Sequence, residues 1–393
     1  MRCEWKEVEL SEVADLTVGF VGTMASHYTE NGILFLRSTN IEPFNIKMDD
    51  VRYISPEFNE TIKKSQLNPD DIVIVRTGKP GACTVIPQKT EPWNCSDLVI
   101  IHPNKEKINP HFLASYINLA SGVINAHLVG AVQQHFNVGA AKKMKIPLPP
   151  IHIQNRIASI IQGLNDKIEL NNKINENLER QAEAIFKAWF IAFEPWNGKK
   201  PCEWVDAPLG SFVEIKRGGS PRPIQDFLSD TGLRWLKISD VTSLTSPYIL
   251  DIKEHIKLEG LRKTVHLNAG ELVLSNSATP GIPKILDVDS CIHDGWLYFP
   301  KSQLSKYWLY LFFKHIRQEL ILLGNGSIFT NLKTDILKAF PVTKADEKTL
   351  YAFEKLIKPL FETMLNADRE SKRLTALRDA LLPKLMSGEI QIL

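Results

Sequence analysis

Polar and basic side chains follow strand-like runs in both halves of this 393-residue chain. In the first half they are Arg37, Ser38, Thr39 and Asn40, then Arg76, Thr77 and Lys79, then Gln133, Gln134 and His135. In the second half they are Lys237, Ser239 and Asp240, then Asn276, Ser277 and Thr279, then Asn325, Ser327, Thr330 and Asn331. Such side chains can hydrogen-bond to base edges in a DNA groove or to phosphates. Any one of these loops alone is better explained as a solvated turn, so it is their matched placement in two halves that predicts DNA contact.

The same sequence offers no set of residues for catalysis. Gly78-Lys79-Pro80-Gly81 lacks the spacing and the following Ser or Thr of a phosphate-binding loop. An amino-methyltransferase would need an acid or amide before a Pro-Pro-aromatic sequence, whereas residues 148–151 read Leu-Pro-Pro-Ile. Pro69-Asp70 could begin a nuclease metal site, but no acid-x-Lys follows, and the second half has Ala269-Gly270 at that place. This pair therefore predicts a turn, and the ten scattered histidines predict no metal site.

Composition describes an ordinary globular protein with room for two or three domains. Lys and Arg number 47 against 45 Asp and Glu, so any basic surface must be local. The five cysteines are odd in number and dispersed, which predicts a reducing, cytoplasmic location and argues against structural zinc. The longest apolar runs, 188–193 and 307–313, are too short to span a membrane, so no membrane association is expected.

The two halves repeat one pattern about 200 residues apart. Residues 204–209 correspond to 5–10, residues 233–240 to 33–40, and residues 267–281 to 67–81. Within the last pair of segments Leu67, Asn68, Val73, Pro80 and Gly81 have identical counterparts. Further matches in the same order are Asp97 with Asp294, Tyr116 with Tyr310, Gly130 with Gly324, and Ile146-Pro147 with Phe340-Pro341. This ordered set of matches predicts an internal duplication.

Each repeat is followed by a long amphipathic pattern. Over 152–190 the apolar positions recur at alternating steps of three and four, interrupted only by Asn171 and Asn175. A similar stripe runs over 346–386. A helix of this length cannot bury its own stripe, so we expect the two helices to pair as an antiparallel coiled coil. Pro359, inside the second stripe, is expected to kink or break that helix.

These patterns predict an α+β fold with two duplicated domains, of mixed α/β composition, and two long helices. The predicted bounds are residues 1–146 and 196–341 for the domains, with 147–195 and 342–393 for a central and a C-terminal spacer helix. The blocks match in scaffold residues but differ in their polar loops. That difference is expected if two copies of one fold read two short sequences.

The helical segments carry a resemblance to a known family. They contain Pro147-Leu148-Pro149-Pro150-Ile151, Gln154-Asn155-Arg156-Ile157-Ala158, Asn175-Glu176-Asn177-Leu178-Glu179, residues 184–190 (Ala-Ile-Phe-Lys-Ala-Trp-Phe) and residues 377–390. In these motifs, and across essentially the whole chain, the sequence resembles the specificity subunit of type I DNA restriction–modification systems. The resemblance implies a non-catalytic, cytoplasmic subunit that reads a bipartite site on double-stranded DNA, one half-site per domain.

The resemblance also implies partners. Two methyltransferase (modification) subunits holding S-adenosylmethionine and restriction subunits holding ATP and Mg would dock on this chain, which would bind no cofactor itself. We expect Phe186, Phe190 and Phe361 to lie off the helix seam and to bind the methyltransferase. Two other hypotheses stay open at this point: a fused, self-sufficient DNA methyltransferase, and a coiled-coil adaptor that does not bind DNA.

Overall fold

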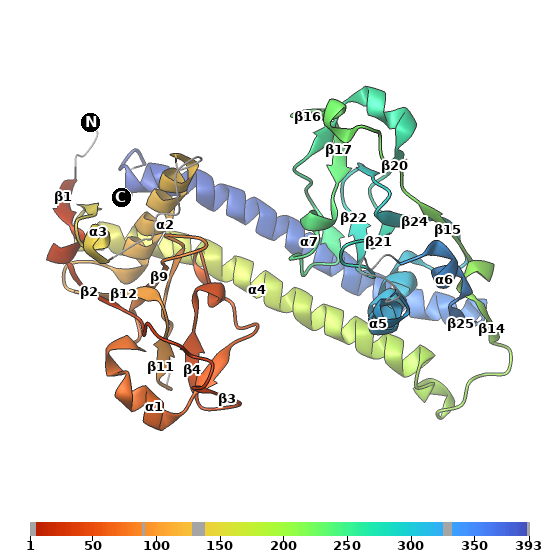
Figure 1. Cartoon of the computed structure of the whole chain (residues 1–393), viewed down its shortest axis with the longest axis horizontal. Helices are drawn as coiled ribbons and strands as arrows, with labels where there is room; N and C mark the ends of the chain where they lie inside the picture. The colour runs from red at the N-terminus through yellow and green to blue at the C-terminus, as the bar shows by residue number, and fades with distance from the viewer. Residues whose placement is uncertain (1–4, 89–90, 128–137, 325–331, 391–393) are drawn as a thin grey trace. The chain divides into compact units, whose positions relative to one another are not determined.

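Two compact units make up the chain in a computed structural model, which describes residues 5–88, 91–127, 138–324 and 332–390. Unit 1 comprises residues 1–168 and 373–393, and unit 2 comprises residues 169–372. Helix α4 (Ile151–Phe190) and helix α7 (Glu347–Met386) each contribute residues to both units (Figure 1). These bounds agree with the helices predicted over 152–190 and 346–386.

Unit 1 is built on two small sheets. One has the order β10-β9-β12-β2 and is antiparallel throughout; the other has the order β3-β7-β4-β11-β8, with β4 and β11 parallel. The strands are β1 (Lys6–Glu9), β2 (Ala14–Val18), β3 (Tyr28–Thr29), β4 (Ile33–Leu36), β5 (Ile41–Glu42), β6 (Asn45–Ile46), β7 (Arg52–Ile54), β8 (Gln66–Leu67), β9 (Ile72–Val75), β10 (Cys83–Val85), β11 (Trp93–Cys95), β12 (Leu98–Pro103) and β13 (Lys145–Leu148), and the shorter helices are α1 (Pro56–Thr61), α2 (Pro110–His127) and α3 (Val138–Lys142).

Unit 2 repeats this plan. Its first sheet runs β15-β24-β21-β22-β18 and its second β16-β19-β17-β23-β20, with β17 and β23 again parallel. The strands are β14 (Val205–Pro208), β15 (Val213–Arg217), β16 (Leu228–Ser229), β17 (Leu233–Leu236), β18 (Tyr248–Ile249), β19 (His255–Ile256), β20 (Val265–Leu267), β21 (Leu272–Ser275), β22 (Pro283–Leu286), β23 (Ser290–Ile292), β24 (Trp296–Ser302) and β25 (Pro341–Lys344), and the helices are α5 (Lys306–Gly324) and α6 (Thr334–Ala339).

The shared strand order confirms the predicted duplication. In each unit the entering strand pairs with the strand that precedes the long helix, β1 with β13 and β14 with β25. The short turn before the β9 strand has left-handed backbone at Asp70 and at its counterpart Gly270. A left-handed residue is what a tight turn uses, so Pro69-Asp70 is a turn, as predicted.

Within each unit α4 and α7 pack antiparallel. In unit 1, Ile157 and Ile161 of α4 share a core with Leu382 and Leu385 of α7. In unit 2, the order along α7 is likewise reversed, because Asn171 hydrogen-bonds to Glu370 at 2.9 Å and Asn175, one turn further on, to Asp368 at 2.7 Å. Both asparagines are buried, and the side-chain N–H groups of both donate hydrogen bonds across the seam to α7.

Pro359 does not break α7, which contradicts one outcome of the sequence prediction. The helix is continuous from Glu347 to Met386. Pro359 is exposed, so the carbonyl that loses its helical partner can bond to water, while the neighbouring Ile357 and Phe361 side chains are fully buried. Tertiary packing on both sides of the proline therefore holds the helix together.

One charged side chain of α4 packs against α5 at the edge of the unit 2 core. Glu179 of α4 is only 15% exposed and accepts hydrogen bonds from Tyr310 at 2.6 Å and Lys314 at 2.8 Å, both on α5. Lys314 also pairs with Glu183 at 2.5 Å. This buried polar cluster connects α4 to the core of unit 2, which the heptad pattern alone does not reveal.

Candidate nucleic-acid interface

Four segments of unit 2 meet at one end of its sheets. They are the segment after β15, the turn after β17, the loop after β21 and the turn between β23 and β24. Main-chain hydrogen bonds hold them together: Gly218 donates to the Trp296 carbonyl at 2.9 Å, and Asn276 donates to the Gly295 carbonyl at 2.9 Å. The Trp296 indole donates to the Leu236 carbonyl at 3.2 Å, which attaches the turn after β17.

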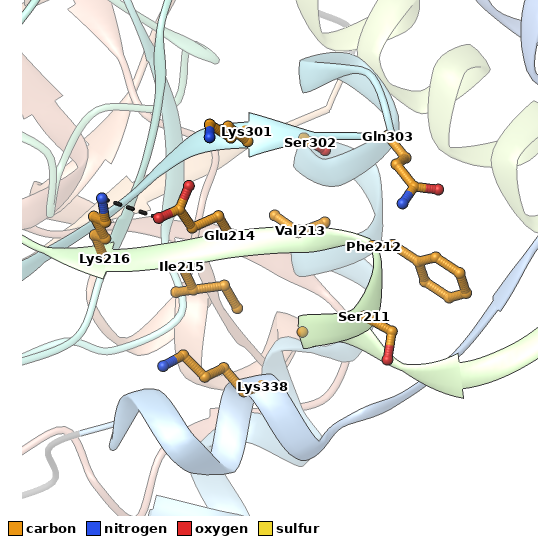
Figure 2. Close-up of a pocket in the computed structure, with 11 residues that line it drawn as sticks. Ser211, Phe212, Val213, Glu214, Ile215, Lys216, Lys301, Ser302, Gln303 and Lys338 are labelled. Carbon is orange, nitrogen blue, oxygen red and sulfur yellow. Dashed lines mark ion pairs between the residues drawn. The ribbon is translucent and has the colours of Figure 1, made fainter.

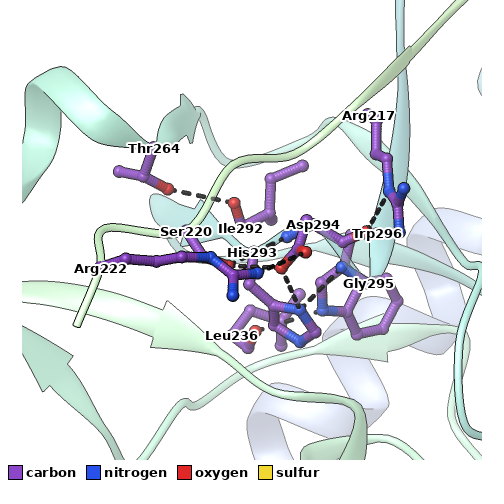
Figure 3. A network of polar contacts seen from close by, with 10 residues as sticks. All are labelled: Arg217, Ser220, Arg222, Leu236, Thr264, Ile292, His293, Asp294, Gly295 and Trp296. Carbon is purple, nitrogen blue, oxygen red and sulfur yellow. Dashed lines mark hydrogen bonds and ion pairs between the residues drawn. The ribbon is translucent and has the colours of Figure 1, made fainter. Parts of the chain in front are cut away.

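Asp294 is at the centre of this junction (Figure 3). Its carboxylate accepts hydrogen bonds from the Ser220 hydroxyl at 2.5 Å and from Arg222 at 3.2 Å. Its main-chain carbonyl accepts a hydrogen bond from Arg217. The Ser220 hydrogen bond is the largest cause that lowers the pKa of Asp294, and the positive charge of Arg222 adds to it, so the carboxylate is ionised at neutral pH.

A surface hollow opens beside Asp294. Its lining combines apolar and polar side chains from all four segments and from β17: Ser220, Pro221, Arg222, Pro223, Ile224, Gln225, Trp235, Lys237, Ile238, Ser239, Ser277, Ala278 and His293. The His293 Nδ1 accepts a hydrogen bond from the Gly295 main chain at 2.8 Å. Burial lowers the pKa of His293, so its ring is neutral at pH 7 and presents its second nitrogen as a donor.

Unit 1 forms the same junction with different side chains. Ser96 donates to the Leu36 carbonyl at 3.0 Å, and Asp97 donates through its main chain to the Phe20 carbonyl at 3.1 Å. The Asp97 carboxylate then binds Arg76 at 2.6 Å and Thr77 at 3.4 Å. The aspartate is therefore common to both units, but its arginine partner comes from the loop after β9 in unit 1 and from the segment after β15 in unit 2.

Glycine allows the close approach on which both junctions depend. A Cβ at Gly19 would lie 2.9 Å from the Cys95 carbonyl oxygen, and one at Gly218 would lie 2.3 Å from the His293 carbonyl oxygen. A side chain at either position would push the segment after β2 or β15 away from the neighbouring turn. The lack of space for a side chain therefore explains why both halves have glycine at this position.

Several predicted contact residues are brought together by the fold. In unit 2, Lys237, Ser239 and Ser277 line the same hollow. In unit 1, Arg76 and Thr77 meet at Asp97, while Arg37 pairs with Asp50 at 2.9 Å. Ser38 is half-buried and Thr39 exposed on the turn that follows Arg37, and Lys79 is exposed on the loop that follows Thr77. Their contact with DNA stays a prediction.

Other predicted contact residues have structural roles. Asn40 is buried, accepts the Arg37 main-chain N–H at 3.1 Å and donates to the Lys47 carbonyl. Asp240 accepts the Lys237 main-chain N–H at 2.9 Å in the same way. Asn276 is buried, its main-chain carbonyl accepts a hydrogen bond from the Leu332 main chain, and its side-chain oxygen has no hydrogen-bond partner within the described residues. Thr279 lines a different hollow, which also contains Lys284.

The third loop of each predicted set lies outside the described residues. It comprises Gln133, Gln134 and His135 in the first half and Asn325, Ser327, Thr330 and Asn331 in the second. Their predicted DNA contacts therefore stay predictions.

The three phenylalanines expected to bind a partner do not lie on a free surface. Phe186 is 1% exposed, Phe190 6% and Phe361 0%, and all three belong to the hydrophobic core of unit 2. The Phe186 ring lies 5.4 Å from that of Trp308 on α5 and 6.2 Å from that of Phe353 on α7. The expectation that these rings lie off the packed face is wrong, because α4 packs against α5 as well as α7 in this part of the helix.

Sequence reasoning missed the segment Ser220–Gln225, which supplies six of the residues that line the hollow. Two signals were available. Gly-Gly-Ser-Pro-Arg-Pro (218–223) directly follows the strand-like run 213–217, and Asp97 and Asp294 occupy matched places in the two repeats. Interpreting Asp294 only as a residue that matches Asp97 gives no indication that it binds Arg222.

A second hollow of unit 2 is basic. It lies between the start of β15, the end of β24 and α6, and Lys216, Lys301 and Lys338 are among its lining residues (Figure 2). Glu214 pairs with Lys216 at 2.9 Å. None of the predicted loop residues contributes to it, so it is separate from the junction at Asp294.

The described ranges contain neither a cluster of metal-ligating side chains nor a helix that could span a membrane. No group of three or more histidine, cysteine or acidic side chains there is arranged to hold a metal ion. No helix in that part of the chain has the length and apolar character needed to cross a bilayer.

Comparison with known proteins gives one consistent family. A family model described as "Type I restriction modification DNA specificity domain" matches residues 3–180 and 201–348. The MjaIX specificity subunit of a type I restriction enzyme from Methanocaldococcus jannaschii is 24% identical over 64% of this chain and 62% of its own length, so the chain spans less than two thirds of that relative. The HindI specificity subunit from Haemophilus influenzae is 24% identical over 74% of this chain and 80% of its own length.

A solved structure has the same fold. The crystal structure of the S subunit of a type I restriction–modification system from M. genitalium aligns with a TM-score of 0.61 at 14% sequence identity. The alignment covers 97% of this chain and 96% of that one.

Proposed function

We propose, on the premise that this chain belongs to the type I restriction modification DNA specificity domain family, that it is a sequence-specific DNA-binding subunit of a type I restriction–modification complex. The observation that carries the proposal is the duplicated junction. Two units of one topology bring matched loops together around Asp97 and Asp294 but present different side chains there. Two readers of different half-sites on double-stranded DNA need this combination of a common scaffold and variable loops.

The remaining roles follow from the same proposal. Residues 1–146 and 196–341 would each read one half-site, and the helical segments 147–195 and 342–393 would act as spacers and dock two methyltransferase subunits. Those subunits would hold S-adenosylmethionine, and restriction subunits would hold ATP and Mg, so this chain would contribute no catalytic group. Because Phe186, Phe190 and Phe361 are buried, docking would use the exposed apolar side chains of the helices: Leu170, Tyr351, Leu356 and Leu377.

The direct test is to produce the full chain with its modification subunits and to map methylated adenines in genomic DNA by sequencing. We expect methylation at a single bipartite motif, and no methylation from either component alone. Methyl transfer by the purified chain without partners would instead indicate a fused methyltransferase. Failure of the full chain and of the complex to bind any DNA sequence selectively would indicate a coiled-coil adaptor.

A second prediction concerns independence of the two readers. Exchanging residues 1–146 for the corresponding block of a related specificity subunit should change one half of the methylated motif and leave the other half as it was. The physical reason is that each junction closes within its own unit, through Asp97 in unit 1 and Asp294 in unit 2. The reciprocal exchange of residues 196–341 is the control. A change in both halves after one exchange would contradict modular reading.

A further inference from the structure

Arg222 is a highly exposed cation at the unit 2 junction. Its side chain is 78% exposed, and one terminal nitrogen contacts the Asp294 carboxylate at 3.2 Å. Pro221 and Pro223 flank it in the sequence, and a proline fixes its own φ and restricts the residue before it. The main chain that carries Arg222 therefore has few alternative conformations, which lowers the entropy cost of holding its side chain against a ligand.

The carboxylate that touches Arg222 is itself held in place. The Ser220 hydroxyl donates to the other oxygen of Asp294, and Arg217 donates to its carbonyl (Figure 3). Arg222 also borders a hollow whose buried part is apolar, through Trp235 and Ile238, and whose other lining residues include Lys237 and Ser277. Asp294 thus holds the guanidinium beside a protein surface that is partly apolar and partly polar. The edge of a base pair in the major groove is likewise partly apolar and partly polar.

We propose that Arg222, positioned by Asp294 and Ser220, reads a guanine in the half-site recognised by residues 196–341. This inference rests on the proposed function, and deepens it by naming a specificity-determining residue and its base. The two parallel N–H groups of a guanidinium match the O6 and N7 acceptors of guanine, and arginine to guanine is the commonest specific contact in the major groove.

The neighbouring carboxylate distinguishes a base contact from a phosphate contact. An ionised Asp294 so close to the guanidinium repels a phosphate group, which carries a full negative charge, more strongly than it repels the acceptors of a base, which carry only partial charges. It also restricts the rotation of the guanidinium, which a bidentate contact requires and a simple charge contact does not.

Unit 1, which has no arginine at the position that corresponds to Arg222, provides a comparison for the assignment. The position corresponding to Arg222 is Thr23, which is exposed, and Asp97 binds Arg76 instead. Arg76 is more enclosed, with a side chain 22% exposed against 78% for Arg222. The same aspartate therefore anchors arginines on different segments, so the two units present guanidinium groups at different places to their half-sites.

The test uses the chain assembled with its modification subunits. Methylation rates are measured on duplexes in which each base pair of the mapped motif is replaced in turn. Arg222→Lys keeps the charge and removes the fork geometry, and Asp294→Asn keeps the shape and removes the anchoring charge. Since Arg222 is exposed, its substitution leaves no buried void, and circular dichroism of each complex checks folding. Lys301→Ala is the matched control, because it removes a cation of the same unit outside the junction.

We expect Arg222→Lys to lower discrimination for guanine about tenfold at one position of one half-site, with every other position unchanged. Asp294→Asn should lower discrimination at that same position by a smaller factor, as a positioning residue would, and Lys301→Ala should leave all base preferences intact. A uniform loss at every position, with a salt dependence reduced by about one phosphate contact, would overturn the proposal, and so would unchanged discrimination. Absence of any bipartite motif in the unsubstituted complex would overturn the proposed function instead.

Discussion

Replacing Phe186 with alanine is expected to lower the free energy of unfolding of unit 2 by about 3–5 kcal/mol. The ring is 1% exposed and lies among Phe190, Trp308 and Phe353, at centroid distances of 5.4, 5.4 and 6.2 Å. Its removal loses the transfer free energy of a large aromatic side chain and leaves a cavity that three neighbouring rings cannot fill. Urea unfolding followed by tryptophan fluorescence measures the change.

Lys187 provides the control for this prediction. It is the next residue of α4 and is exposed, so Lys187→Ala should change the free energy of unfolding by less than about 0.5 kcal/mol. A loss below about 1 kcal/mol for Phe186→Ala would mean that this face of α4 is not packed in solution. A failure of Phe186 variants to bind a methyltransferase subunit should accordingly be attributed to unfolding unless stability has been measured.

Stability of unit 2 is expected to rise with pH between about 8 and 10.5, because of Lys284. This lysine is 3% exposed, and its ammonium donates to the main-chain carbonyls of Leu244 and Ser246. Burial lowers the pKa of Lys284 from its ordinary 10.5 to about 8. Facing charges act in both directions, since Glu179 on α4 and Asp368 on α7 raise this pKa while Lys314 and Arg317 on α5 lower it.

The sign of the effect follows from proton binding. Below about pH 8 both the folded and the unfolded chain carry the proton, and the folded state bears the full cost of a buried charge. Between about pH 8 and 10.5 the unfolded state binds more protons than the folded state, so the cost is relieved as pH rises. The difference between the two pKa values corresponds to about 3 kcal/mol over this interval.

Lys284→Met isolates this contribution. The substitution keeps the length of the side chain and removes the titrating group, so the difference in unfolding free energy between variant and unsubstituted chain should change by about 3 kcal/mol from pH 7.5 to 10. Other titrating groups are common to both proteins and cancel in the difference. Lys338→Met, at an exposed position, should show a constant difference. A constant difference for Lys284→Met as well would show that its ammonium is solvated.

The sequence predicted the features that depend on local pattern. Heptad spacing located α4 and α7 to within one residue, and ordered matches between the halves predicted the common strand order. The heptad pattern did not predict which side chains are buried where α4 has two neighbouring helices, α5 and α7. Phe186 and Glu179 fall outside the α4–α7 seam in the heptad count, but α5 packs against that side of α4 and buries both.

Prediction of the candidate site was limited in the same way. Two of the loops predicted for the second half, those after β17 and β21, line one hollow, because strand order brings their ends together. Residue types within those loops did not separate contact residues from structural ones. Asn40 and Asp240 hydrogen-bond to the main chain of their own turns. That role depends on the folded conformation of the turn, which residue type alone does not predict. The Asp294–Arg222 pair joins segments 72 residues apart, a tertiary contact that no local pattern encodes.

The two seam asparagines limit how the length of the chain can vary among related proteins. Asn171 hydrogen-bonds to Glu370 and Asn175 to Asp368 on α7, so sliding one helix past the other by a turn would break both of these hydrogen bonds. Insertions or deletions in α4 and α7 are therefore tolerated only in steps of about seven residues, which return the amides to equivalent positions on the helix surface. Spacer length in such proteins should accordingly take discrete values, with intermediate lengths selected against through loss of stability.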